Sequence, residues 1–249
     1  MAAFPAAWIF DLDGTLVQTE RLKAESYHAA LVQVDASISA DRVLAHYATV
    51  VGRSGEEVAR SFFGPFTTPE AVGAALGSEP GEAPWQTLYR VRRSAYAALV
   101  EDEAAIQRVA CPFNRALLQA IRSEGAPVAL ATMSHRPQVD RILGILELEG
   151  DFDRVATRDD VERGKPDPEI YALVFDELGL PPGQSVIIED SPSGARAAIA
   201  SGAHVLVVVN DVTRDAIARA DLPPDRVEVL ESDATLVAKV RAWRATAAR

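Results

Sequence analysis

Four short apolar runs, each closed by polar residues, constrain the fold of this chain more than any other feature. They are Ala7–Phe10, Pro127–Ala131, Ser185–Ile188 and His204–Val209. Such runs are typical of strands in a parallel sheet that is covered on both faces. Helical patterns fill the segments between them, at Arg115–Arg122, Arg141–Leu148, Glu169–Leu178 and from Ser191-Pro192 to Gly202. The alternation predicts an α/β fold with a mostly parallel sheet.

One long segment interrupts this alternation. Between residues 19 and 108 the sequence has helical patterns and no strand pattern. Two apolar stripes predict helices, the first formed by Ala24, Tyr27, Leu31 and Val34, the second by Val91, Ala95, Ala98 and Leu99. Between the stripes, Gly64–Pro84 is rich in glycine and proline, which favours a loop. We therefore expect a helical domain over residues 19–108, inserted into a core formed by residues 1–18 and 109–249.

Net charge and composition limit which kinds of molecule this chain can bind. The chain has 36 acidic and 25 basic residues, a formal charge of −11. This charge disfavours nucleic acids and anionic membranes. No apolar run is long enough to span a bilayer, and the amino terminus lacks the pattern of a signal peptide. The single cysteine, Cys111, cannot form an internal disulfide. We expect a cytoplasmic protein that is a monomer or weak dimer and binds neither nucleic acid nor membrane.

Polar residues follow three of the predicted strands at the point where each strand ends. Asp11 and Asp13 follow the first, Thr132 the second, and Glu189-Asp190 the third. Ligands bind at the carboxyl ends of the strands in open parallel sheets. Carboxylates that converge there would repel one another unless a hard cation lies among them. Mg²⁺ suits such a site because it accepts a few carboxylates and leaves positions for water and phosphate oxygens.

This arrangement predicts phosphoryl-transfer chemistry. Asp11 could attack phosphorus and form an aspartyl-phosphate. Asp13 could protonate the leaving oxygen and then accept a proton from water. Thr132 can donate a hydrogen bond to the transferring phosphoryl group. Lys165, in the segment Gly164–Pro168, can supply a positive charge that attracts the same group. The chain has only three lysines, so a lysine at this place is conspicuous.

Four motifs in order resemble those of the haloacid dehalogenase-like superfamily. They are DLDGTLV at Asp11–Val17, LATMS at Leu130–Ser134, GKPDPEIY at Gly164–Tyr171 and IIEDSPSGARAA at Ile187–Ala198. The resemblance covers nearly the whole chain and is greatest to the branch of β-phosphoglucomutase, CbbY and phosphosugar phosphatases. It implies a Rossmann-like parallel sheet core with an inserted helical cap.

The resemblance also implies roles for individual residues. Asp11 would be the nucleophile and a magnesium ligand, and Asp13 the general acid/base, with its main-chain carbonyl as a second ligand. Thr132 and Lys165 would hold the phosphoryl group, with Lys165 also paired to Asp11. Asp190 would bind Mg²⁺ directly, and Glu189 directly or through water. We further expect Ser134 and, in the cap, Glu20 and Arg53 to contact the substrate. The roles of the cap residues Lys23, Arg92 and Arg93 stay open.

Two departures from the mutase pattern favour a hydrolase. Mutases of this branch carry a histidine shortly after the first motif, where this chain has Lys23. The cap motif Val51–Ser54 is present, but Gly55-Glu56 stands where a mutase places an arginine. The sequence thus predicts a Mg²⁺-dependent phosphatase for a small phosphorylated metabolite, with a sugar phosphate as the expected substrate. The alternatives are a β-phosphoglucomutase-like mutase and a non-catalytic protein that binds a phosphorylated metabolite.

Overall fold

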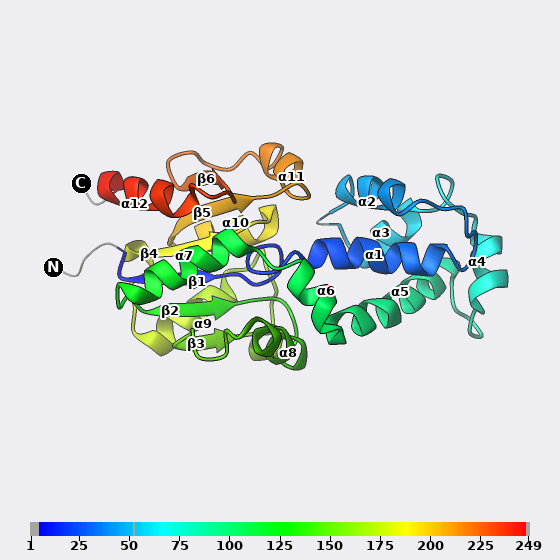
Figure 1. Ribbon diagram of the computed structural model, residues 1–249, viewed down its shortest axis with the longest axis horizontal. Coiled ribbons are helices and arrows are strands. Elements are labelled where there is room, and N and C mark those ends of the chain that lie inside the picture. The colour runs from blue at the N-terminus through cyan, green and yellow to red at the C-terminus, as the bar shows by residue number, and fades with distance from the viewer. Residues whose placement is uncertain (1–4, 52, 248–249) are drawn as a thin grey trace. The chain divides into compact units, whose positions relative to one another are not determined.

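The computed structural model describes residues 5–51 and 53–247, which form two compact units (Figure 1). The first unit contains residues 5–18 and 110–247. The second contains Thr19–Val109.

A six-stranded parallel sheet forms the first unit. In sheet order its strands are β3 (Arg154–Ala156), β2 (Val128–Ala131), β1 (Ala7–Phe10), β4 (Ser185–Glu189), β5 (His204–Val209) and β6 (Val227–Glu231). Every neighbouring pair is parallel. The four predicted strands are present, and the sheet is Rossmann-like, as expected.

The two strands that the sequence did not indicate are the edge strands, β3 and β6. Both contain partly exposed residues, in contrast to the buried runs of β1, β2 and β4. An edge strand has a neighbour on one side only and is covered less completely. Its sequence therefore lacks the continuous apolar run that marks the central strands.

Helices cover both faces of the sheet (Figure 1). Those of the first unit are α7 (Pro112–Ser123), α8 (Arg136–Leu146), α9 (Glu169–Leu178), α10 (Pro192–Ala200), α11 (Arg214–Ala218) and α12 (Leu236–Ala247). Helices α9 and α10 pack against Ile9, Ile187 and Val205 on one face. On the other face, the guanidinium carbon of Arg244 on α12 lies 5.6 Å from the ring centroid of Trp8. Because β1 is buried from both sides, it is the centre of the core.

In the second unit, the described residues form a bundle of six helices around an apolar core of their own. They are α1 (Thr19–Leu31), α2 (Ala40–Ala48), α3 (Gly55–Ser61), α4 (Pro69–Leu76), α5 (Pro84–Glu101) and α6 (Glu103–Arg108). The predicted stripe of Ala24, Tyr27 and Leu31 is buried there. Tyr27 stacks on Phe62 with ring centroids 4.6 Å apart.

Two details of this unit differ from the sequence prediction. The glycine- and proline-rich segment contains the helix α4, which Thr68 and Pro69 begin. Helix α5 is present, but its buried residues are Thr87, Leu88, Arg92 and Val100, whereas Ala98 of the predicted stripe is exposed. Val91 of the stripe packs against the core, but the polar residue Arg92 occupies the buried face of this helix, which the apolar pattern did not indicate.

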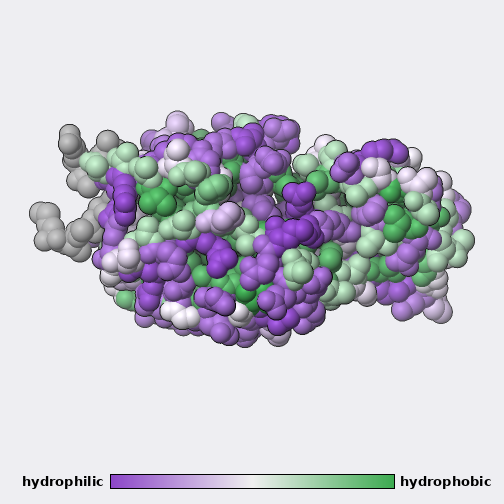
Figure 2. All heavy atoms as spheres, in the orientation of Figure 1, coloured by the Kyte–Doolittle hydropathy of each residue, from purple (hydrophilic) through white to green (hydrophobic). Residues whose placement is uncertain are grey.

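Hydrophilic and hydrophobic side chains are interspersed on the face of the molecule in Figure 2. Phe113 and Val229 are large apolar residues with substantial exposure. Among the described residues, no helix is both long and apolar enough to cross a lipid bilayer.

A carboxylate in the second unit allows a test of its acid stability. Glu82 accepts hydrogen bonds from Arg90 Nε at 3.0 Å, Thr87 Oγ1 at 2.9 Å and the Glu79 amide at 3.0 Å. These contacts, chiefly with Arg90, lower the pKa of Glu82 from 4.5 to about 2. A lowered pKa stabilises the fold above the unfolded pKa, and this contribution is lost as the pH falls through the folded value.

We therefore expect Glu82→Gln to lower the melting temperature at neutral pH and to flatten its dependence on pH between about 4.5 and 2. Thermal melts followed by circular dichroism would measure this. Glu56→Gln is the matched control, because Glu56 pairs with Arg60 in an exposed i,i+4 contact at 2.7 Å. Equal effects of the two substitutions would contradict the prediction.

Candidate active site

The predicted site residues meet at the carboxyl ends of three neighbouring strands. Strand β1 lies between β2 and β4, and Phe10 is in register with Leu130 on one side and Ile188 on the other. Asp11 follows β1, Thr132 follows β2, and Glu189-Asp190 lies at the end of β4. Residues more than 100 positions apart in the sequence are thereby brought to one edge of the sheet.

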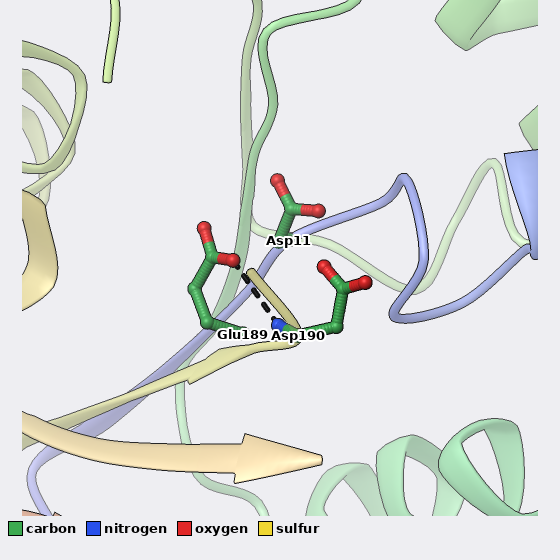
Figure 3. Close-up of side chains that lie close together, drawn as sticks. All are labelled: Asp11, Glu189 and Asp190. Atoms are coloured by element: carbon green, nitrogen blue, oxygen red, sulfur yellow. Dashed lines mark hydrogen bonds between the residues drawn. The ribbon is translucent and has the colours of Figure 1, made fainter. Parts of the chain in front are cut away.

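Three carboxylates form a buried cluster at this edge (Figure 3). One oxygen each of Asp11, Glu189 and Asp190 lies within 4.8 Å of the others. The three residues are only 5, 1 and 2% exposed. Carboxylates this close and this buried repel one another strongly unless positive charge is present.

Lys165 supplies a positive charge to this cluster. Its Nζ donates hydrogen bonds to Asp11 Oδ1 at 2.7 Å, to Glu189 Oε1 at 2.7 Å and to the Ala131 carbonyl at 3.0 Å. Only 6% of the side chain is exposed. The pairing of Lys165 with Asp11 that the resemblance implied is thus present.

The pKa values of this pair reflect burial and mutual attraction. Burial raises the pKa of Asp11 to about 8; Lys165 opposes this increase, whereas Glu189 and Asp13 add to it. Burial disfavours the charged form of Lys165, but attraction to Asp11 and Glu189 outweighs it, so the pKa of Lys165 is well above its usual value. One ammonium among three carboxylates leaves an excess of negative charge, which makes the cluster suitable for a cation.

Tyr171 belongs to this network, although no pattern in the sequence indicated a role for it. Its hydroxyl donates to Glu189 Oε1 at 2.7 Å, and its ring centroid lies 4.9 Å from Lys165 Nζ. Burial raises the pKa of Tyr171 well above 10.0. One feature of the sequence could have identified Tyr171: its hydroxyl is a polar group on the apolar face of α9, six positions after Lys165.

Glu189 accepts hydrogen bonds on both carboxylate oxygens. Lys165 and Tyr171 donate to Oε1. The Asp190 amide at 3.1 Å and the Ser191 hydroxyl at 3.2 Å donate to Oε2. Ser191 is also the N-cap of α10, because its hydroxyl accepts from the Gly194 amide.

The carboxylate of Asp13 lies outside the buried cluster. Its Oδ2 accepts hydrogen bonds from Thr132 Oγ1 at 2.9 Å and Ser134 Oγ at 2.8 Å. Its Oδ1 is buried and has no hydrogen-bond partner among the described residues. Of the strand-end carboxylates that we expect to converge, the structure brings three together. Asp13 diverges because β1 ends at Phe10, so strand alternation no longer fixes the side chains after it.

Gly14 follows Asp13 in a conformation that favours glycine. Its φ angle is +84°, and a Cβ at this position would lie 1.9 Å from Asp190 Oδ2. A side chain here would displace the Asp190 carboxylate. The main chain of the turn therefore packs directly against the carboxylate cluster.

The predicted cap residues all lie in the helical unit. Glu20 accepts from Lys23 Nζ at 2.5 Å and from the Tyr47 hydroxyl at 2.7 Å. Arg92 is buried, with its guanidinium between 5.1 and 5.6 Å from the rings of Tyr27, Tyr89 and Tyr96. Arg53 and Arg93 are exposed. Gly52, in the predicted cap motif, lies outside the described residues.

Comparison with known proteins identifies relatives along most of the chain. A validoxylamine A 7'-phosphate phosphatase from Streptomyces hygroscopicus is 30% identical over 221 residues, covering 86% of this chain and 90% of that protein. A phosphorylated carbohydrates phosphatase from Thermotoga maritima is 30% identical, covering 79% and 81%. The structure of CbbY from Rhodobacter sphaeroides in complex with xylulose-(1,5)bisphosphate is similar, with a TM-score of 0.59, 25% identity and coverage of 90% and 93%.

The family assignment rests on a match that spans most of the chain. The family model for haloacid dehalogenase-like hydrolases matches residues 6–202, which include all four sequence motifs. With the parallel sheet and the residues gathered at its carboxyl edge, this match shows that the chain belongs to the haloacid dehalogenase-like hydrolases.

Proposed function

We propose that this chain is a Mg²⁺-dependent phosphatase that hydrolyses a small phosphorylated metabolite through an aspartyl-phosphate. The observation that supports this most is the contact of Lys165 Nζ with Asp11 Oδ1 at 2.7 Å, inside a cluster of buried carboxylates. A buried lysine beside one strand-end carboxylate provides a positive site for a phosphoryl group next to a candidate nucleophile.

Asp11 is the nucleophile in this mechanism. Lys165 binds Oδ1 and leaves Oδ2 without a hydrogen-bond donor among the described residues. A carboxylate oxygen attacks phosphorus, a new bond forms between it and phosphorus, and the bond to the leaving alcohol oxygen breaks. Water then attacks the phosphorus of the aspartyl-phosphate, which releases inorganic phosphate and restores the carboxylate.

Asp13 carries the proton in both steps. It protonates the leaving alcohol oxygen in the first step and accepts a proton from the attacking water in the second. The hydroxyls of Thr132 and Ser134 hold its Oδ2, whereas Oδ1 has no partner. This leaves one oxygen of a fixed carboxylate available for the transfer.

The residues present fit a magnesium ion. The cluster consists of oxygen donors, which Mg²⁺ prefers, and its negative charge exceeds that of the single ammonium beside it. The ion would be held by Asp11, Asp190 and the main-chain carbonyl of Asp13. Glu189 would act through water, because both its oxygens already accept hydrogen bonds. When bound, Mg²⁺ offsets the charge on the phosphoryl oxygens.

A sugar phosphate is the substrate class that we propose. Two relatives are named as phosphatases of validoxylamine A 7'-phosphate and of phosphorylated carbohydrates. We propose that Glu20 and Arg53 of the helical unit contact the substrate. We propose the same for Ser134 of the first unit. A carboxylate at Glu20 suits hydroxyl donors on a sugar.

We expect the chain to release phosphate from p-nitrophenyl phosphate and from members of a sugar phosphate panel only when Mg²⁺ is present. Asp11→Asn should reduce turnover by at least about 10³-fold, because it removes the nucleophile. Asp140→Asn is the matched control, since Asp140 is an exposed residue on α8. A phosphate-release assay with and without chelator measures both effects. Turnover retained by Asp11→Asn would overturn the assignment of the nucleophile.

The same panel separates the proposed function from its alternatives. Isomerisation of a hexose 1-phosphate without release of phosphate would favour a mutase. Tight binding of one metabolite with no turnover of any would favour a binding protein. Either result would replace the phosphatase assignment.

Gly194 allows a separate test of the cation site. A Cβ there would lie 1.9 Å from Glu189 Oε1, so Gly194→Ala should displace that carboxylate. Alanine usually favours a helix over glycine by about 1 kcal/mol, so a loss of Mg²⁺ affinity in this variant would not follow from helix propensity. We expect Mg²⁺ affinity to fall by about 10–100-fold, measured by calorimetric titration. Gly183→Ala, where a Cβ meets nothing within 4 Å, should leave the affinity unchanged.

A further inference from the structure

Three side-chain amides bind the main chain directly after Asp13. Gln18 Nε2 donates to the Gly14 carbonyl at 3.1 Å, and Asn210 Nδ2 donates to the same oxygen at 3.3 Å. Asn114 Nδ2 donates to the Thr15 carbonyl at 2.5 Å. Two successive carbonyls of the turn are thus held by side chains. No role for these three residues follows from the four sequence motifs.

The amides come from three separate places in the first unit, and each is itself anchored. Asn114 lies on α7, is 1% exposed and accepts from the Ser232 hydroxyl at 2.7 Å. Asn210 follows β5 and accepts from the amides of Val212 and Thr213 at 2.8 and 3.1 Å. Gln18 also donates to Cys111 Sγ at 3.2 Å. The turn is therefore connected to fixed points on several elements.

These contacts determine the path of the chain next to Asp13. The Gly14 amide donates to the Val17 carbonyl at 2.7 Å. With the two carbonyl contacts, three successive peptide units after Asp13 are held in orientation. The turn also has no free space toward the carboxylate cluster, because Gly14 packs against Asp190. A shift of the turn would thus move Asp13, displace Asp190, or both.

We propose that Gln18, Asn114 and Asn210 form an amide clasp that positions Asp13 for proton transfer. The proposal rests on the proposed function, which gives Asp13 its role as acid and base. The three amides are positioning residues, because they touch the main chain beside Asp13 and not the reacting atoms. The geometry of proton transfer is sensitive to small displacements, so loosening the turn slows the chemical steps more than substrate binding.

Substitutions that remove an amide donor test the clasp. Asn210→Asp keeps the oxygen that accepts from Val212 and Thr213 but removes the donor to Gly14. We expect kcat to fall by about 10–100-fold with KM changed by less than about threefold. Asn210→Ser also removes the amide donor and adds no charge, so it should show the same split between kcat and KM. Asn114→Asp extends the test to the Thr15 carbonyl.

Gln33→Glu is the matched control. Gln33 Nε2 donates to the Ala29 carbonyl at 3.0 Å, which is the same kind of contact on an exposed side chain of the helical unit. This variant should keep the wild-type kcat and KM. A loss of kcat in Gln33→Glu equal to that in the Asn210 variants would overturn the proposal. An effect of the Asn210 variants on KM alone would overturn it as well.

A second measurement keeps the clasp testable independently of catalysis. Hydrogen exchange of the Gly14 amide, followed by NMR in the wild-type chain and in Asn210→Ser, reports whether the turn has loosened. Exchange that rises more at Gly14 than at the amides of β1 supports the clasp, and exchange that rises no more than there overturns it. If the wild-type chain releases no phosphate, the proposed function fails, whereas the exchange result still decides whether the amides hold the turn.

Discussion

The contact of Lys165 with Asp11 and Glu189 is the interaction on which the rest of the site depends. Two acids and a base, each less than a tenth exposed, are stable together because their charges are paired and because Lys165 and Glu189 make further hydrogen bonds. The Ala131 carbonyl and the Tyr171 hydroxyl supply those additional hydrogen bonds. The site is therefore built as one network that reaches from β1 through β2 and β4 to α9, and not as separate strand-end residues.

The order of the strands makes this network possible. The first strand of the chain lies in the middle of the sheet, between β2 and β4, and all strands point the same way. The residue after β1 is consequently flanked by residues that follow two much later strands. Burial of Trp8, Ile9 and Phe10 between helices on both faces fixes the position of β1 and hence that of Asp11. Core packing and active-site geometry have the same origin here.

The sequence predicted those parts of the structure that depend on burial and strand order. The four central strands and the convergence of Asp11, Thr132 and Asp190 follow from apolar runs and the polar residues that close them. The edge strands and the burial of Arg92 among three tyrosines were missed, since both depend on tertiary neighbours that no local pattern encodes. The separation of Asp13 from the cluster was missed because it depends on the path of a turn.

The carboxylates of the site differ in how many hydrogen bonds they accept, and this difference matches the tasks that we propose for them. Glu189 accepts hydrogen bonds on both oxygens, which suits a residue that holds Lys165 in place. Asp11 is bound on one oxygen only, which leaves the other for the nucleophilic attack that we propose. Asp13 is fixed through Oδ2 by two hydroxyls and retains one unpaired oxygen. Because three similar acids lie in different surroundings, one sheet edge can supply the anchor, the nucleophile and the proton carrier of the proposed mechanism.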